Sequence, residues 1–170
     1  MKLFRCSLCA NAYLGDSTLS HCPFCSVDGR HLLPATEWQD IVVSELSVQS
    51  QGNLEQAMQL EADAAKFYNV AYETASDPLF EAMFSALSRM EYEHAATIAR
   101  LLDVDVPAPA EAPSFVSAVE YLAAANKLEK KIARFYKTAA REANEPDIKT
   151  LFTAFGEAAR EHTNISKLGQ

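Results

Sequence analysis

Hydrophobic residues recur at helical spacing along most of the chain after residue 52, with apolar positions three or four residues apart. Polar and proline-containing breaks divide this region into four amphipathic segments. These segments predict helices at about residues 53–76, 77–102, 114–143 and 146–170. Asn53 offers an N-cap for the first helix, and Asp77-Pro78 is typical of a helix start.

The loops between these helices differ in length. The breaks before the second and fourth helices are short, whereas residues 103–113 contain three prolines and form a long connection. Two hairpins joined by one extended crossover is the connectivity of ferritin-like bundles. The sequence therefore predicts an all-α fold, a ferritin-like four-helix bundle over residues 53–170.

The two hairpins repeat each other at an offset of 68 residues, without a gap. Matching pairs are Glu61 with Glu129, Phe67 with Phe135, Tyr68 with Tyr136, Glu93 with Glu161, and His94 with His162. The period occurs only twice and is longer than that of solenoid repeats. It indicates a duplicated helical hairpin.

Acids and histidines lie on the inner stripe of these helices. Glu91 and His94 form an E-x-x-H motif, which places both side chains one turn apart on one face. Di-iron and di-manganese bundles take one Glu from each of two helices and one such motif from each of the others. The chain supplies Glu61, Glu91, His94, Glu129 and His162. We expect these five to converge on one metal site; the alternative is a solvated acidic face with two incidental histidines.

The second half of the repeat lacks one carboxylate. Ala159 stands 68 residues after Glu91, and on an ideal helix Glu157 and Glu161 point in other directions. The centre can still hold two metals with water or an exogenous anion as the missing ligand, or one metal asymmetrically.

Two tyrosines accompany the candidate ligands. Tyr68 and Tyr136 follow Glu61 and Glu129 by seven residues, two turns along the same face. There a phenol can hydrogen-bond a metal-bound carboxylate or donate an electron. Buried tyrosines without such a role are the alternative.

All four cysteines lie within the first 25 residues, in two C-x-x-C motifs: Cys6, Cys9, Cys22 and Cys25. This spacing predicts a tetrahedral thiolate site for iron or zinc in a small domain at residues 1–34. Four thiolates complete such a site, so we expect His21 and His31 to be surface residues or neighbours of the site. Residues 35–52 form a linker; Thr36 and Gln39 resemble a capping box, which predicts a short helix there. Trp38 is expected to anchor the linker.

The 170-residue chain has a net charge of −8 and five glycines, which suits a compact helical domain with a small appendage. The net charge, and the lack of clustered Lys and Arg, argue against a nucleic-acid partner. No apolar run is long enough for a membrane span, and the N-terminus lacks a signal-peptide pattern. We expect a cytoplasmic protein.

The chain resembles the rubrerythrin family, which joins a rubredoxin-like iron knob to a ferritin-like di-iron bundle. The resemblance rests on Cys6-Ser7-Leu8-Cys9, Cys22-Pro23-Phe24-Cys25 and Glu91-x-x-His94. The knob precedes the bundle here, so the chain is similar to the reversed arrangement. Family members commonly reduce hydrogen peroxide with electrons from the four-cysteine iron, often across a dimer interface.

Three positions depart from the family pattern. Ile132 replaces a second glutamate on the third helix, and Ala159 removes a further carboxylate. Ala10 stands where rubredoxin knuckles usually have glycine, which weakens the case for iron over zinc in the knob.

Two main functions remain open. As an enzyme, the protein would reduce peroxide or oxygen at a di-iron centre, as a homodimer supplied by an electron-donor protein. As a non-catalytic metal protein, it would hold structural zinc in the knob and a weak or absent site in the bundle. Iron storage is less favoured, because the N-terminal knob would obstruct assembly of a cage.

Overall fold

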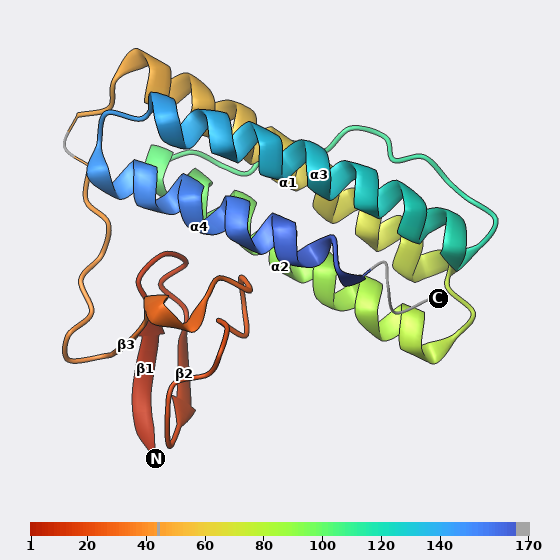
Figure 1. The fold of residues 1–170 in the computed structure, drawn as a ribbon, viewed down its shortest axis with the longest axis horizontal. Helices are drawn as coiled ribbons and strands as arrows, with labels where there is room; N and C mark the ends of the chain where they lie inside the picture. The colour runs from red at the N-terminus through yellow and green to blue at the C-terminus, as the bar shows by residue number, and fades with distance from the viewer. Residues whose placement is uncertain (44, 166–170) are drawn as a thin grey trace.

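A computed structural model describes residues 1–43 and 45–165 (Figure 1). The N-terminal knob contains a three-stranded antiparallel sheet of order β2-β1-β3. Its elements are β1 (Lys2–Cys6), β2 (Ala12–Gly15), the 3-10 helix η1 (Gly29–His31) and β3 (Leu32–Pro34). The bundle consists of α1 (Val48–Thr74), α2 (Pro78–Leu102), α3 (Ala118–Glu142) and α4 (Pro146–His162).

The four helices form two hairpins, with α1 packed on α2 and α3 packed on α4 (Figure 1). The proline-rich segment between α2 and α3 runs along the bundle without regular structure, as predicted. These features confirm the ferritin-like connectivity. The prediction that the fourth helix runs almost to Gln170 is wrong, because α4 ends at His162 and residues 163–165 are not α-helical. Residues 166–170 lie outside the described residues.

Local capping sets the helix starts. Asp77 accepts a hydrogen bond from the backbone of the first turn of α2, as predicted. The predicted starts of α1 and α3 are wrong. Ser47 caps α1, so Asn53 lies inside the helix rather than at its start. Ser117 and Glu120 form a capping box, so α3 begins after Ser117 rather than at Ser114.

The linker after the knob is extended. The short helix predicted near Thr36 is absent, because residues 35–43 contain a turn but no helix. Trp38 fixes this segment instead: its Nε1 donates a hydrogen bond of 2.9 Å to the carbonyl of Cys6. The guanidinium of Arg5 lies 3.5 Å from the centre of its ring.

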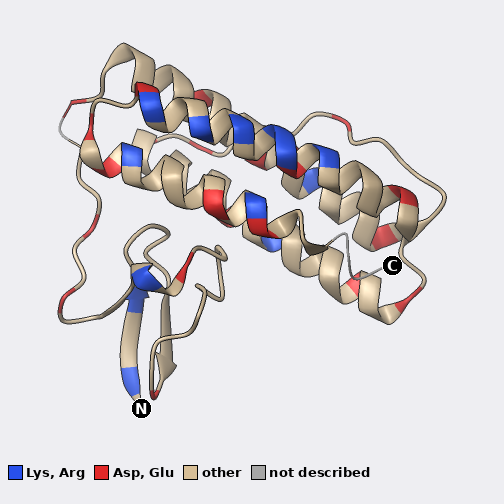
Figure 2. Cartoon of the chain, viewed as in Figure 1, with Lys and Arg blue, Asp and Glu red and all other residues tan. Residues whose placement is uncertain are grey.

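Positive charge concentrates on α3 despite the net charge of −8 (Figure 2). Six exposed cations follow its outer surface: Lys127, Lys130, Lys131, Arg134, Lys137 and Arg141. The premise that Lys and Arg are not clustered is therefore wrong for this helix. The absence of a nucleic-acid partner stays a prediction, and it now rests on net charge alone.

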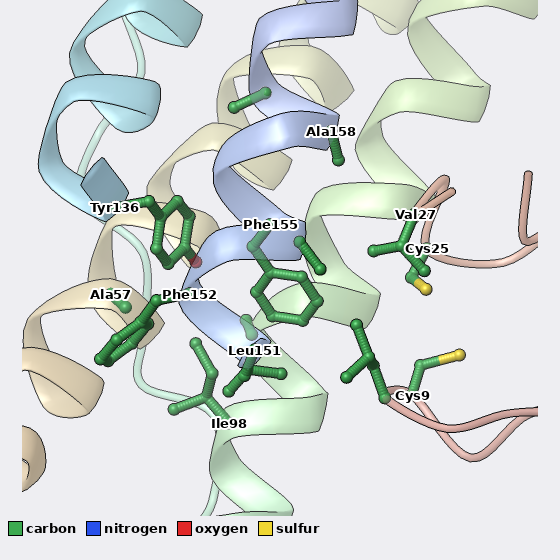
Figure 3. Packing of buried hydrophobic residues seen from close by; sticks show 14 of the residues in the cluster. Cys9, Cys25, Val27, Ala57, Ile98, Tyr136, Leu151, Phe152, Phe155 and Ala158 are labelled. Carbon is green, nitrogen blue, oxygen red and sulfur yellow. The ribbon is translucent and has the colours of Figure 1, made fainter. Parts of the chain in front are cut away.

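The knob packs against the bundle. Val27 and the buried cysteines belong to one apolar cluster with residues of α2 and α4, including Ile98, Leu151 and Phe155 (Figure 3). Within the bundle, α4 approaches α3 closely at Gly156, where an added Cβ would lie 3.0 Å from the Cβ of Tyr136. Helix α4 thus contacts the knob through Leu151 and Phe155 and packs on α3 at Tyr136.

Candidate metal centres

The four cysteines of the knob converge on one point. Their sulfurs lie within 4.8 Å of one another, and all four residues are buried. The Cys6–Cys25 and Cys9–Cys22 sulfur distances are 3.9 and 3.8 Å. A tetrahedron with metal–sulfur bonds of about 2.3 Å has edges of about 3.8 Å, so this spacing fits one thiolate-bound ion.

Both cysteine knuckles have the same backbone geometry. The residue after the second cysteine of each motif is left-handed, with φ of 63° at Ala10 and 56° at Ser26. The amides of these residues donate to the carbonyls of Cys6 and Cys22, respectively. Ala10 therefore adopts the conformation that glycine usually provides, at a cost of about 1–2 kcal/mol.

The bundle brings together all five predicted ligands, with at least one from each helix. The residues are Glu61 on α1, Glu91 and His94 on α2, Glu129 on α3, and His162 on α4. None is more than 7% exposed. Glu61, Glu91 and His94 form one cluster, and Glu91, Glu129 and His162 form a second. Glu91 alone is shared, so it is the one candidate bridging ligand among the described residues.

Several oxygen and nitrogen atoms of this cluster point at one another without forming hydrogen bonds. Among the described residues, Glu61 Oε2, Glu91 Oε1, Glu129 Oε2 and His162 Nδ1 are buried and unpartnered. His162 Nδ1 lies 2.8 Å from Glu91 Oε1, yet the angles do not suit a hydrogen bond. Buried polar atoms in this state are costly. Cations at the two clusters would satisfy these atoms, and carboxylate with imidazole suits iron.

Two tyrosines cross between the halves of the duplicated bundle. Tyr68 donates a hydrogen bond of 2.6 Å to Glu129, and Tyr136 donates one of 2.6 Å to Glu61. Burial and the neighbouring carboxylates raise the pKa of both phenols, so they remain protonated donors. Each phenol therefore orients the glutamate of the opposite hairpin.

Burial and mutual charge set the protonation of the metal-free cluster. Burial and the charge of Glu91 raise the pKa of Glu61 to about 7 and also raise that of Glu129. Burial would raise the pKa of Glu91, but His162 and His94 bring it below its ordinary value. Burial would lower the pKa of His162, but Glu91 and Glu129 raise it to about 10. A metal must displace these protons.

The outer nitrogens of both histidines contact the second cysteine knuckle. His94 Nε2 lies 2.8 Å from the carbonyl oxygen of Cys25, and His162 Nε2 lies 2.8 Å from Ser26 Oγ. A carbonyl only accepts, so His94 carries its proton on Nε2, leaving Nδ1 toward the carboxylates. Nothing in the sequence spacing indicates these contacts, because they join residues 69 and 136 positions apart.

Among the described residues, no carboxylate takes the place that Glu91 has in the first half of the repeat and that Ala159 leaves empty in the second. Ala159 and Ile132 are both buried. Glu157 forms an ion pair with Arg30, and Glu161 Oε2 lies 2.8 Å from His21 Nε2, so both glutamates contact the knob. The described structure thus supplies three carboxylates and two imidazoles to the bundle cluster.

The fold and these clusters define a ferritin-like bundle protein with a four-cysteine domain. The rubrerythrin family model matches residues 52–168, and the chain belongs to this family. The N-terminal knob agrees with the reversed arrangement. The match and the two clusters support a metal-binding scaffold of the oxidoreductase type, and the family implies iron.

Solved structures share the fold at low sequence identity. A hypothetical protein from Pyrococcus furiosus is 19% identical with a TM-score of 0.61, covering 71% of this chain and 87% of its own. A conserved hypothetical protein from Mycobacterium tuberculosis is 14% identical with a TM-score of 0.64, covering 74% and 100%. A secreted ferritin from Trichoplusia ni is 15% identical with a TM-score of 0.59, covering 76% and 82%. No curated protein matches the sequence.

Proposed function

We propose that this protein reduces hydrogen peroxide at the bundle centre with electrons passed from the four-cysteine site. The reaction consumes one peroxide, two protons and two electrons and releases two waters. Iron bound at the two sites would supply the redox chemistry.

One observation carries the proposal: the knuckle formed by Cys22 and Cys25 touches both histidines of the bundle cluster. The Cys25 carbonyl accepts from His94, and Ser26 lies within hydrogen-bond distance of His162. An ion bound by the thiolates is therefore linked to the bundle cluster through Cys25 and the hydrogen bond between its carbonyl and His94. A knob with a purely structural role would not require contact with both histidines.

The residues of the bundle have distinct roles in this proposal. Glu61, Glu129 and the shared Glu91 would hold the metals together with the histidines. Tyr68 orients Glu129 and Tyr136 orients Glu61 by a hydrogen bond, and both phenols keep their protons at neutral pH.

Replacing Ser26 by Ala tests the link without removing a cysteine or a bundle ligand. The reduced, iron-loaded protein is mixed anaerobically with peroxide, and both peroxide loss and the oxidation of the knob are followed by absorbance. Ser26→Ala should slow oxidation of the knob by about 10-fold. Ser7→Ala, on the first knuckle, is the control, because Ser7 contacts His31 rather than the bundle. The proposal is contradicted if Ser26→Ala and Ser7→Ala oxidise the knob at equal rates, or if peroxide does not oxidise the knob of the parent.

A non-catalytic zinc protein is the competing function, favoured by Ala159 and Ile132. It predicts a colourless knob that peroxide does not change.

Among residues 1–43 and 45–165, no helix has the length and apolar character to cross a membrane. We propose that the protein acts in the cytoplasm in oxidative-stress defence, where a reducing environment keeps the four cysteines as thiols, and that it works as a homodimer with an electron-donor protein.

A further inference from the structure

A cavity of about 800 Å³ lies outside both metal clusters, where four distant segments meet. Its walls come from α1, α2, the tip of the second cysteine knuckle and the proline-rich crossover. We propose that this cavity binds a planar aromatic anion, a fused ring system that carries a phosphate or carboxylate. The inference goes beyond the proposed peroxide chemistry and does not depend on which metals the protein holds.

The apolar part of the cavity suits a flat ring. Phe24 and Tyr92 supply aromatic surfaces, Met90 a flexible thioether, and Val106 and Pro107 an aliphatic wall. Aromatic and thioether groups pack favourably on π systems. The volume falls within the range of about 300–1,000 Å³ that small-molecule sites occupy.

The charged part of the cavity favours an anion. Ser88 on α2 donates a hydrogen bond of 2.9 Å to the carbonyl of Ala65 on α1, which sets the adjacent residues Lys66 and Arg89 at the same level of the two helices. Both line the cavity, and within the described part of the chain neither forms an ion pair.

One carboxylate also lines the cavity, and it is already engaged. Glu93 accepts a hydrogen bond of 2.7 Å from Asn11 of the knob. The wall therefore carries two cations without ionic partners against one carboxylate that has a donor. A phosphate between Lys66 and Arg89 would gain charge-assisted hydrogen bonds.

Flavin mononucleotide is a suitable probe, because it combines a planar ring with a phosphate and its fluorescence reports binding. Titration with the full-length protein should give saturable quenching. Lys66→Glu and Arg89→Glu should each weaken binding by about 10-fold or more. Tyr92→Ala should weaken it as well, and riboflavin, which lacks the phosphate, should bind less tightly than the mononucleotide.

Lys137→Glu is the matched control. It changes the net charge equally but lies on α3, where it lines a smaller cationic pocket together with Lys130 and Arg160. The proposal predicts that this variant binds like the parent. An equal loss in Lys137→Glu, equal binding of riboflavin, or no saturable quenching in the parent overturns the proposal. Circular dichroism should show the same helix content in all variants. The fluorescence titration reports binding without any measurement of the activity of the metal-loaded protein.

Discussion

At the scale of single residues, the crossed tyrosine–glutamate pairs distinguish the structure from the sequence pattern. The repeat places each tyrosine on the same helix face as the glutamate of its own helix, and it predicts a hydrogen bond from the phenol to a candidate metal ligand. It does not predict which glutamate accepts that hydrogen bond. Tyr136 reaches Glu61 and Tyr68 reaches Glu129, because α1 and α3 face each other across the bundle. Partner choice depends on interhelical packing, which periodicity does not contain.

Removing one phenol should weaken metal binding in the bundle. In Tyr136→Phe, Glu61 loses a hydrogen bond of 2.6 Å and with it a fixed orientation. We expect the affinity of the bundle for Fe(II) to fall by about 10-fold, with metal in the knob unchanged. Anaerobic metal titration measures this. Tyr121→Phe is the control, since Tyr121 is a buried tyrosine of α3 that contacts the backbone of Phe115. Equal affinities in the two variants would show that the phenol does not orient the ligand.

A second residue-scale prediction concerns the first knuckle. Ala10→Gly should stabilise the knob by about 1 kcal/mol, because glycine adopts the φ of 63° without steric cost. Denaturant unfolding of the metal-loaded protein, followed by loss of thiolate absorption, gives the free energy. Ala12→Gly, in β2, should instead destabilise the knob by about 0.5–1 kcal/mol. Destabilisation by Ala10→Gly would contradict the backbone assignment.

At the scale of secondary-structure elements, the sequence predicted the four helices and the crossover well. Asp77-Pro78 and Pro146 mark helix starts by chemistry that acts within a few residues. The linker could not be predicted in this way. Thr36 and Gln39 have the spacing of a capping box, but the side chain of Trp38 between them donates a hydrogen bond to the Cys6 carbonyl in the knob. A tertiary contact overrides the local signal there.

The start of α4 should make folding stability depend on pH. Glu145 accepts hydrogen bonds from Ser50 and from the amide of Ser47, and these lower its pKa from 4.5 to about 2. Its stabilising effect is therefore complete above pH 4.5 and is lost as the pH falls toward about 2. Glu145→Gln should be less stable than the parent at pH 6, and the difference in unfolding free energy should shrink below pH 4.5. A difference that does not vary with pH would contradict this assignment.

A carboxylate at position 159 should complete the bundle site. Ala159→Glu should raise metal occupancy toward two per chain and accelerate peroxide consumption, because a fourth carboxylate offsets more of the metal charge. Without metal the variant should be less stable than the parent, since it buries another acid. Ala158→Glu is the control, because Figure 3 shows Ala158 on the side of α4 toward the knob. Unchanged occupancy and rate in Ala159→Glu would show that the missing carboxylate does not limit the site.

At the scale of the whole molecule, the knob is held on the bundle by contacts that join distant parts of the sequence. Asn11 donates to Glu93 on α2, and His21 pairs with Glu161 on α4. Sequence patterns indicated which side chains gather in each candidate metal cluster, because these residues lie at regular spacings. They did not place the clusters beside each other, because Ser26 and His162 share no periodicity.

We propose that the four-cysteine site and the bundle cluster of one chain form an electron-transfer pair. Rapid mixing of the reduced, iron-loaded protein with excess peroxide tests it most directly, with oxidation of the knob followed at several protein concentrations. We expect a first-order oxidation of the knob whose rate does not change on dilution, and which disappears in Glu91→Ala although the knob keeps its iron. A knob that stays reduced in the parent, or that is oxidised at the same rate in Glu91→Ala, would show that the bundle cluster does not take electrons from the knob.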